Sequence, residues 1–127
     1  MPFRDIGRVV VLVHDQEEAL QFYRDVLGFE TLHDSEADGC RYLHMGPPGG
    51  AGVWLMTPSR EEERGLVGRQ AGGQPLLVLY TDDIDQAADR LHDHGVPVWA
   101  ERTDAGSRSL HFRDVAGNVI VAAQLTA

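Results

Sequence analysis

The sequence predicts an α+β fold of two tandem β-α-β-β-β modules, with mostly antiparallel curved sheets enclosing a cleft and helices on the outer face. Two observations predict it: an internal repeat with an offset of 67 or 68 positions, and two amphipathic helices with matching start and stop residues. The 127 residues suffice for one domain. We expect a single domain over 1–127, with module one at about 5–57, a linker at about 58–73 and module two at about 74–125.

Each module opens with an apolar run that leads into a helical pattern. The first run, 8–13, precedes a helix whose apolar residues recur at helical spacing, namely Ala19, Phe22, Tyr23 and Val26. The second run, 75–80, precedes a helix with the same pattern in Ile84, Ala87, Ala88 and Leu91. Asp15 and Asp83 are suited to be N-caps, and Gly28 and Gly95 stand where a left-handed residue ends each helix.

The repeat continues in the strands that follow. The segment 41–45 (RYLHM) matches 108–112 (RSLHF), and both alternate as strands do. Each leads into a turn-rich segment, 46–52 or 114–118, and then into a final apolar strand, 53–56 or 119–125. The polar linker between the modules has one predicted helical turn around Arg60 to Arg64.

Charge and composition exclude several classes of partner. The net charge of −9 and the scattered basic residues are unsuited to nucleic acid or to an anionic membrane surface. No apolar run approaches the roughly 18 residues that span a bilayer, and the N-terminal residues do not resemble a signal peptide. Cys40 is the single cysteine, so neither an internal disulfide nor a Cys-rich zinc site can form. We therefore expect a cytoplasmic protein.

Three motifs resemble those of the vicinal oxygen chelate superfamily, which includes glyoxalase I, the extradiol dioxygenases and the bleomycin-resistance proteins. They are the helix segment from Asp15 to Phe29, the segment from Thr81 to Val96, and the turn Phe112-Arg-Asp114-x-x-Gly117-Asn118, where Val115 replaces the usual proline. The resemblance covers essentially the whole chain. It is specific for the fold and weak for the reaction, because the superfamily contains many enzymes as well as drug-binding proteins.

The resemblance also implies where catalytic members hold a divalent metal. The matching positions on the first strands are Arg8 and Leu76, and those on the last strands are Val121 and Trp54. A protonated Arg cannot ligate a metal, and Leu, Val and Trp offer no donor atom for one. We therefore predict that the usual metal site, and with it any metal cofactor, is absent.

The remaining candidates are polar or aromatic residues on predicted strands. His44 and His111 are equivalent in the two modules and should lie on the face opposite the core, either as structural residues or as an acid/base pair or non-standard ligands. Glu101 follows a predicted strand and is either a general base or an exposed carboxylate. We assign His14, His33, His92 and His94 to solvent.

Arg8 and Trp54 suggest a ligand-binding surface. Arg8 offers a bidentate donor for an anionic group, unless it pairs with an acidic neighbour, and Trp54 offers a flat wall, unless it lies in the core. The further predicted lining residues are Tyr42, Met56, Leu76 and Val121, and Trp99 is another candidate. The preferred hypothesis is a metal-free protein that binds a planar or apolar small molecule, similar to bleomycin-resistance proteins.

Two enzymatic alternatives stay open. One is a metal-dependent glyoxalase-like lyase or isomerase, or a ring-cleaving dioxygenase, with His44, His111 and Glu101 as non-standard ligands. The other is a metal-independent enzyme that uses Arg8 and a histidine. We also expect a homodimer, because each module leaves a sheet edge and an open face uncovered. A monomer in sedimentation at micromolar concentration would count against the dimer, and the sequence leaves open whether modules pair within or between chains.

Overall fold

The computed structural model describes residues 2–126. The chain divides into two compact units, one that ends at Val67 and one that begins at Gly68. This boundary falls inside the predicted linker. No helix within the described residues combines the length and the apolar character that a membrane crossing requires.

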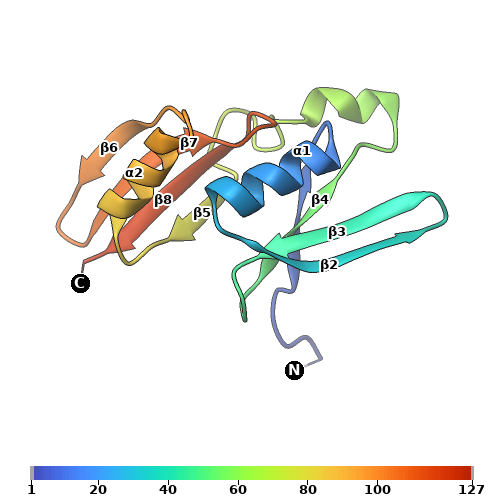
Figure 1. The fold of residues 1–127 in the computed structure, drawn as a ribbon, viewed down its shortest axis with the longest axis horizontal. Helices are drawn as coiled ribbons and strands as arrows, with labels where there is room; N and C mark the ends of the chain where they lie inside the picture. The colour runs from blue at the N-terminus through green and yellow to red at the C-terminus, as the bar shows by residue number, and fades with distance from the viewer. Residues whose placement is uncertain (1, 127) are drawn as a thin grey trace. The chain divides into compact units, whose positions relative to one another are not determined.

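Unit 1 contains a four-stranded mixed sheet with one helical segment against it (Figure 1). Its elements are β1 (Arg8–Leu12), α1 (Gln16–Gln21), the π-helical η1 (Phe22–Val26), β2 (Glu30–Ala37), β3 (Cys40–Gly46), β4 (Gly52–Met56) and the 3₁₀-helical η2 (Glu61–Leu66). The strand order is β1-β4-β3-β2. Strand β1 runs parallel to β4, and the other pairs are antiparallel. The helical turn predicted around Arg60 to Arg64 is therefore present as part of η2.

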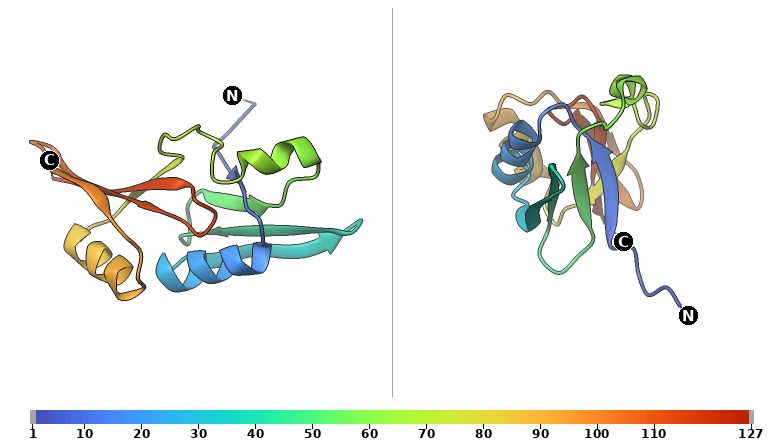
Figure 2. Two further views of the ribbon diagram at one scale, coloured as in Figure 1. Left: turned by 90° about the horizontal axis from the view of Figure 1, so that it is seen from above. Right: turned by 90° about the vertical axis from the view of Figure 1, so that its right-hand side faces the viewer.

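Unit 2 repeats this design. Its elements are β5 (Leu77–Tyr80), α2 (Ile84–Asp93), β6 (Trp99–Thr103), β7 (Ser107–Arg113) and β8 (Val119–Leu125). The order β5-β8-β7-β6 matches that of unit 1, again with the first and last strands parallel. Helix α2 packs against β8, on one face of the sheet (Figures 1 and 2). The predicted α+β class with two βαβββ modules is confirmed.

The caps of both helices follow the prediction. The Asp15 side chain accepts a hydrogen bond from the Glu18 N–H, and the Asp83 side chain accepts one from the Gln86 N–H, each at 3.0 Å. Gly28 and Gly95 have φ values of 75° and 71°, in the left-handed region that glycine adopts without steric cost.

The structure differs from the sequence prediction at three places. The second half of the first helix is π-helical, and the Phe29 N–H bonds to the Tyr23 carbonyl at 2.9 Å. Strand β5 begins at Leu77, and the Leu76 N–H just before it donates to the Val119 carbonyl at 2.8 Å. Glu101 lies within β6 and does not follow a strand, since a bulge between Trp99 and Arg102 inserts one extra residue. Ala100, in that bulge, has a positive φ of 55°.

An arginine ties each sheet to its helix. Arg41 on β3 pairs with Glu17 in the first turn of α1 at 2.9 Å, and also with Asp34 at 2.8 Å. Arg108, the equivalent residue on β7, pairs with Asp85 in the first turn of α2 at 2.9 Å. Hydrogen bonding to these arginines, assisted by their charge, holds the pKa values of Asp34 and Asp85 below the usual range. The two equivalent arginines thus have the same structural role, since each pairs with an acidic residue in the first turn of the helix of its unit.

The turn between β7 and β8 is built around a buried carboxylate. Asp114 accepts hydrogen bonds from the backbone N–H groups of Ala116 and Asn118, at 3.0 and 2.8 Å, and from the Asn118 side-chain amide at 3.0 Å. Both Asp114 and Asn118 are buried. A buried carboxylate needs several donors of this kind, which explains why this turn requires Asp and Asn at these positions.

Gly68 packs directly against this turn. Its φ is +76°, and a Cβ built on it would collide with the carbonyl oxygen of Ala116. Gly72 has a similar φ of +74° but has nothing within 4 Å of such a Cβ. Comparison of alanine substitutions at the two glycines therefore separates the cost of a left-handed backbone from the cost of a steric clash.

We predict that Gly72→Ala lowers the free energy of unfolding by about 1–2 kcal/mol, the cost of a left-handed non-glycine residue. Gly68→Ala should cost at least about 1 kcal/mol more, because the turn must also shift. Urea unfolding followed by circular dichroism measures both values. Equal losses in the two variants would contradict the close packing of Gly68 on the turn.

Candidate functional site

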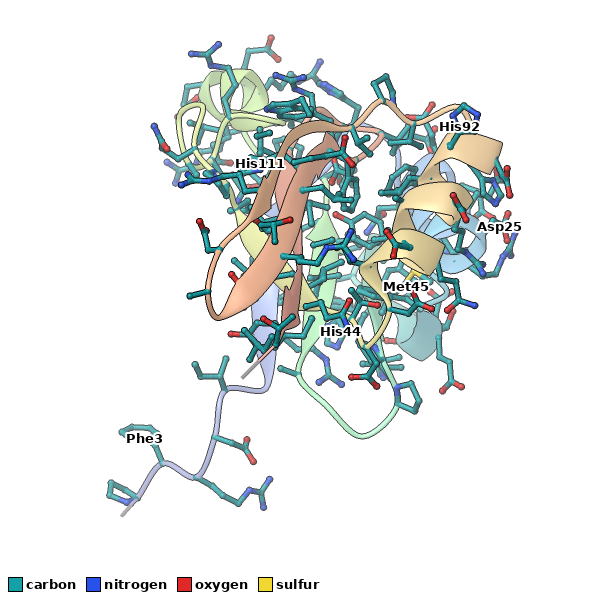
Figure 3. All side chains as sticks on the ribbon, turned by 90° about the vertical axis from the view of Figure 1, so that its left-hand side faces the viewer. Phe3, Asp25, His44, Met45, His92 and His111 are labelled. Atoms are coloured by element: carbon teal, nitrogen blue, oxygen red, sulfur yellow. The ribbon has the colours of Figure 1, made fainter. Side chains whose placement is uncertain are left out.

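The sheet of unit 1 has two faces with different side chains. Val11, Leu43, Met45, Val53 and Leu55 are buried on the face that packs against α1 and η1. The opposite face carries Arg8, His33, Tyr42, His44, Trp54 and Met56, and we call it the His44 face. Figure 3 labels His44 and its buried neighbour Met45 on β3. Strand alternation places these neighbours on opposite faces, as the sequence predicted for His44.

Arg8 and His44 are joined by a hydrogen bond on this face. The Arg8 Nε–H donates to Nδ1 of His44 at 3.2 Å, and one terminal guanidinium N–H donates to the Gly7 carbonyl at 2.8 Å. Within residues 2–126, Arg8 forms no ion pair with a carboxylate. The structure therefore does not show the alternative in which Arg8 pairs with an acidic neighbour. Arg8 instead keeps donor groups on the exposed edge strand β1.

Aromatic rings line the centre of the His44 face. Trp54 is directly opposite His44 in the β3–β4 ladder, and their ring centroids are 5.4 Å apart. Tyr42 lies beside Trp54 with a centroid separation of 5.7 Å, and His33 lies 5.2 Å from His44. Met56 is half-buried near the end of the same strand as Trp54. Trp54 therefore lies outside the α1-facing core, as the ligand-binding hypothesis requires.

Two ring nitrogens on the His44 face are buried without a hydrogen-bond partner. They are Nε2 of His44 and Nε1 of Trp54. A buried polar atom without a partner costs about 1–3 kcal/mol, so such atoms are rare in folded proteins. Their occurrence on adjacent, directly paired residues marks this face as a candidate binding site.

Unit 2 carries a related arrangement around His111. Its ring lies 5.7 Å from that of Trp99, and its Nδ1 is buried without a partner. Val121 is opposite His111 in the β7–β8 ladder, and the Arg113 guanidinium stacks over Trp99 at 4.5 Å. Leu76 is half-buried just before β5. The sequence candidates His111 and Val121 thus lie together with Trp99, as neighbours on one sheet.

The other candidate residues are exposed. Glu101 is exposed on β6. His14, His33, His92 and His94 are all exposed, as predicted. His33 nevertheless lies on the His44 face. Sequence reasoning missed this position because the bulge between Thr31 and His33 determines to which face of the sheet the His33 side chain points. Only the pairing register of β2 could have indicated it.

The residues present do not fit the family's usual metal. Within residues 2–126, no three His, Cys, Asp or Glu side chains gather closely enough to hold a metal ion. Of the four positions implied by the resemblance, Arg8 and Trp54 offer only N–H groups, and Leu76 and Val121 offer no polar atom. Nδ1 of His44 already accepts the Arg8 hydrogen bond, which removes it as a free ligand.

Comparison with known proteins identifies the family. Residues 5–122 match the model of the glyoxalase/bleomycin resistance protein/dioxygenase superfamily. The chain belongs to this superfamily. It is also 32% identical to a protein of Shewanella frigidimarina that carries no functional name, over 91% of this chain and 90% of that protein.

Two solved structures are similar over nearly their whole length. The first is TnmS3, an antibiotic binding protein from Streptomyces sp. CB03234, with a TM-score of 0.82, 30% identity and 99% of each chain covered. The second is a superfamily member from Sphaerobacter thermophilus, with a TM-score of 0.80, 29% identity, and 98% of this chain and 99% of that one covered. A binding protein is thus among the solved structures of closely similar fold.

The environment of His44 disfavours the protonated form of its ring. Desolvation, with smaller coulombic contributions from Arg8 and His33, lowers the pKa of His44 below its ordinary value of 6.5. A histidine whose pKa is lower in the folded chain binds protons preferentially in the unfolded chain. Its stabilising contribution is therefore complete above the unfolded pKa and is lost as the pH falls through the folded one.

We predict that the free energy of unfolding decreases as the pH is lowered from about 7.5 to about 5.5, and that His44→Gln reduces this decrease. The variant removes the proton uptake that accompanies unfolding in that range. Urea titrations at several pH values give both slopes. Superimposable pH profiles for the two proteins would show that His44 does not titrate as its surroundings indicate.

Proposed function

We propose that the protein binds a planar or apolar small molecule on the His44 face, without the family's usual metal centre. The observation that carries this proposal is the cluster of Arg8, His44 and Trp54, in which Arg8 and Trp54 stand at two of the positions implied for metal ligands and His44 contacts both. Similarity to TnmS3, an antibiotic binding protein, supports a binding role over a catalytic one.

The composition of the cluster suits a flat ligand. Trp54 and Tyr42 offer aromatic surface on the same face, and stacking on such rings stabilises planar molecules. Met56 adds a flexible apolar side chain that adapts to irregular ligand shapes. The polar groups are few and adjacent, as in small-molecule sites where a small number of polar contacts fixes orientation.

The homodimer expected from the sequence remains part of this proposal. Strands β1 and β5 each form one edge of a sheet, and both carry exposed apolar side chains. These are Val9, Val10, Val78 and Tyr80. Exposed apolar edge strands favour association with a second chain.

We predict that a neutral planar probe, 2-naphthylmethanol, binds the protein and that Trp54→Ala weakens binding about three- to tenfold, the usual range for loss of one aromatic contact. Equilibrium dialysis measures both affinities. Phe3→Ala is the matched control, because Phe3 is an exposed aromatic on the N-terminal segment, away from the strands of unit 1 (Figure 3). Absence of probe binding up to millimolar concentration, or equal weakening by both variants, would contradict the proposal.

The metal-dependent alternative is tested separately. We predict that purified protein exposed to Mn, Fe, Ni or Zn and then desalted retains far less than one metal per chain, because the described cluster lacks a set of ligands. Elemental analysis of the desalted protein gives the ratio. Retention of about one metal per chain, lost in His44→Gln, would instead favour an enzyme that uses non-standard ligands.

A further inference from the structure

The hydrogen bond from Arg8 determines which nitrogen of His44 carries the proton. A guanidinium only donates, so Nδ1 of His44, which receives the bond at 3.2 Å, must be the unprotonated acceptor. In a neutral imidazole the proton then resides on Nε2. Nε2 is one of the buried atoms without a partner, so His44 presents an unused N–H donor.

Trp54 presents a second unused donor beside it. An indole nitrogen can only donate, and Nε1 of Trp54 is also buried without an acceptor. The two residues are directly paired across β3 and β4. Arg8 adds guanidinium N–H groups on the same face, free of any carboxylate in the described part of the chain.

The His44 face thus gathers donors without matching acceptors. His33 also lies beside His44, and its Nε2 is already engaged with the Ser35 hydroxyl at 2.8 Å. Because both unused N–H groups are withdrawn from water, an oxygen that reaches them displaces no bound solvent from them. Neither nitrogen is exposed in the free protein, so such an oxygen reaches them only when side chains that cover them move.

We propose that the ligand of the His44 face is a planar aromatic molecule that carries a carboxylate or a similar oxygen acceptor, and that Arg8 prepares the site by holding His44 in its Nε2–H tautomer. The ring of the ligand contacts Trp54 and Tyr42, and its oxygen accepts from Nε2 of His44, Nε1 of Trp54 and Arg8. This inference rests on the proposed function and adds the chemical class of the ligand.

The overall charge of the chain opposes an anionic ligand, so a preference for one is a strict test of the proposal. With a net charge of −9, long-range electrostatics favour a cationic ligand over an anionic one. A preference for an anion must therefore come from local donors. The donors on the His44 face are charge-assisted at Arg8 and desolvated at His44 and Trp54, the two conditions under which hydrogen bonds to an anion are strongest.

The first test is direct observation of the tautomer. Two-dimensional ¹H–¹⁵N spectra of the histidine rings, assigned with His44→Gln, should show Nδ1 unprotonated and Nε2 protonated in the free protein at neutral pH. Arg8→Met should convert His44 to a mixture of tautomers, whereas Arg4→Met, at an exposed arginine of the same unit, should not. A predominantly Nδ1–H ring in the wild-type protein would overturn the proposal.

The second test compares two probes with one ring system, 2-naphthoate and 2-naphthylmethylammonium, by equilibrium dialysis. We expect 2-naphthoate to bind about tenfold more tightly or better, and Arg8→Met to abolish the preference. Trp54→Phe keeps an aromatic ring but removes the N–H, so it should weaken 2-naphthoate and leave the cationic probe nearly unchanged. Thermal unfolding confirms that each variant is folded.

The outcomes separate the two proposals. If both probes bind with equal affinity, or if Trp54→Phe affects them equally, the planar site stands and the oxygen-acceptor inference is wrong. If the cationic probe binds more tightly, the inference is likewise wrong. If neither probe binds up to millimolar concentration, both the inference and the planar-ligand proposal fail.

Discussion

Alternation along β3 and β4 is the constraint on which the candidate site depends. Leu43, Met45 and Leu55 are buried against the helical segment of unit 1, and this burial fixes the pairing register of the two strands. A slip of one residue would exchange the faces of both strands. The same register therefore sends His44 and Trp54 to the other face, directly opposite each other. Core packing, and not any contact with a ligand, positions the donors.

The helix is held over the sheet by polar contacts that the repeat partly duplicates. Arg41 and Arg108 pair with acidic residues in the first turn of their helices, where negative charge is also favoured by the helix dipole. The Gln16 side chain adds two hydrogen bonds in unit 1, to the carbonyls of Arg41 and Leu55 at 3.0 and 2.9 Å. In unit 2 the Gln124 side chain accepts the Ile84 N–H. The fold is duplicated, but these additional contacts are not.

The equivalent histidines of the two units have different surroundings. His44 and His111 are equivalent in the repeat and each lies beside a tryptophan, yet Trp54 comes from β4 and Trp99 from β6. Arg8 hydrogen-bonds His44, whereas Arg113 stacks on Trp99. The equivalent histidines therefore have different partners, and within residues 2–126 only that of unit 1 accepts a hydrogen bond from an arginine. This difference favours the His44 face over the equivalent face of unit 2 as the ligand-binding surface.

The sequence by itself determined the fold class, both helix caps and the face on which His44 lies, because these follow from local periodicity and from capping chemistry. It also identified Arg8 and Trp54 as unsuited to bind a metal. The tertiary structure decided what these residues do instead. The Arg8–His44 hydrogen bond, the place of His33 and the position of Glu101 within β6 depend on strand register and on two bulges. Register arises from packing between segments far apart in the chain, which no local pattern specifies.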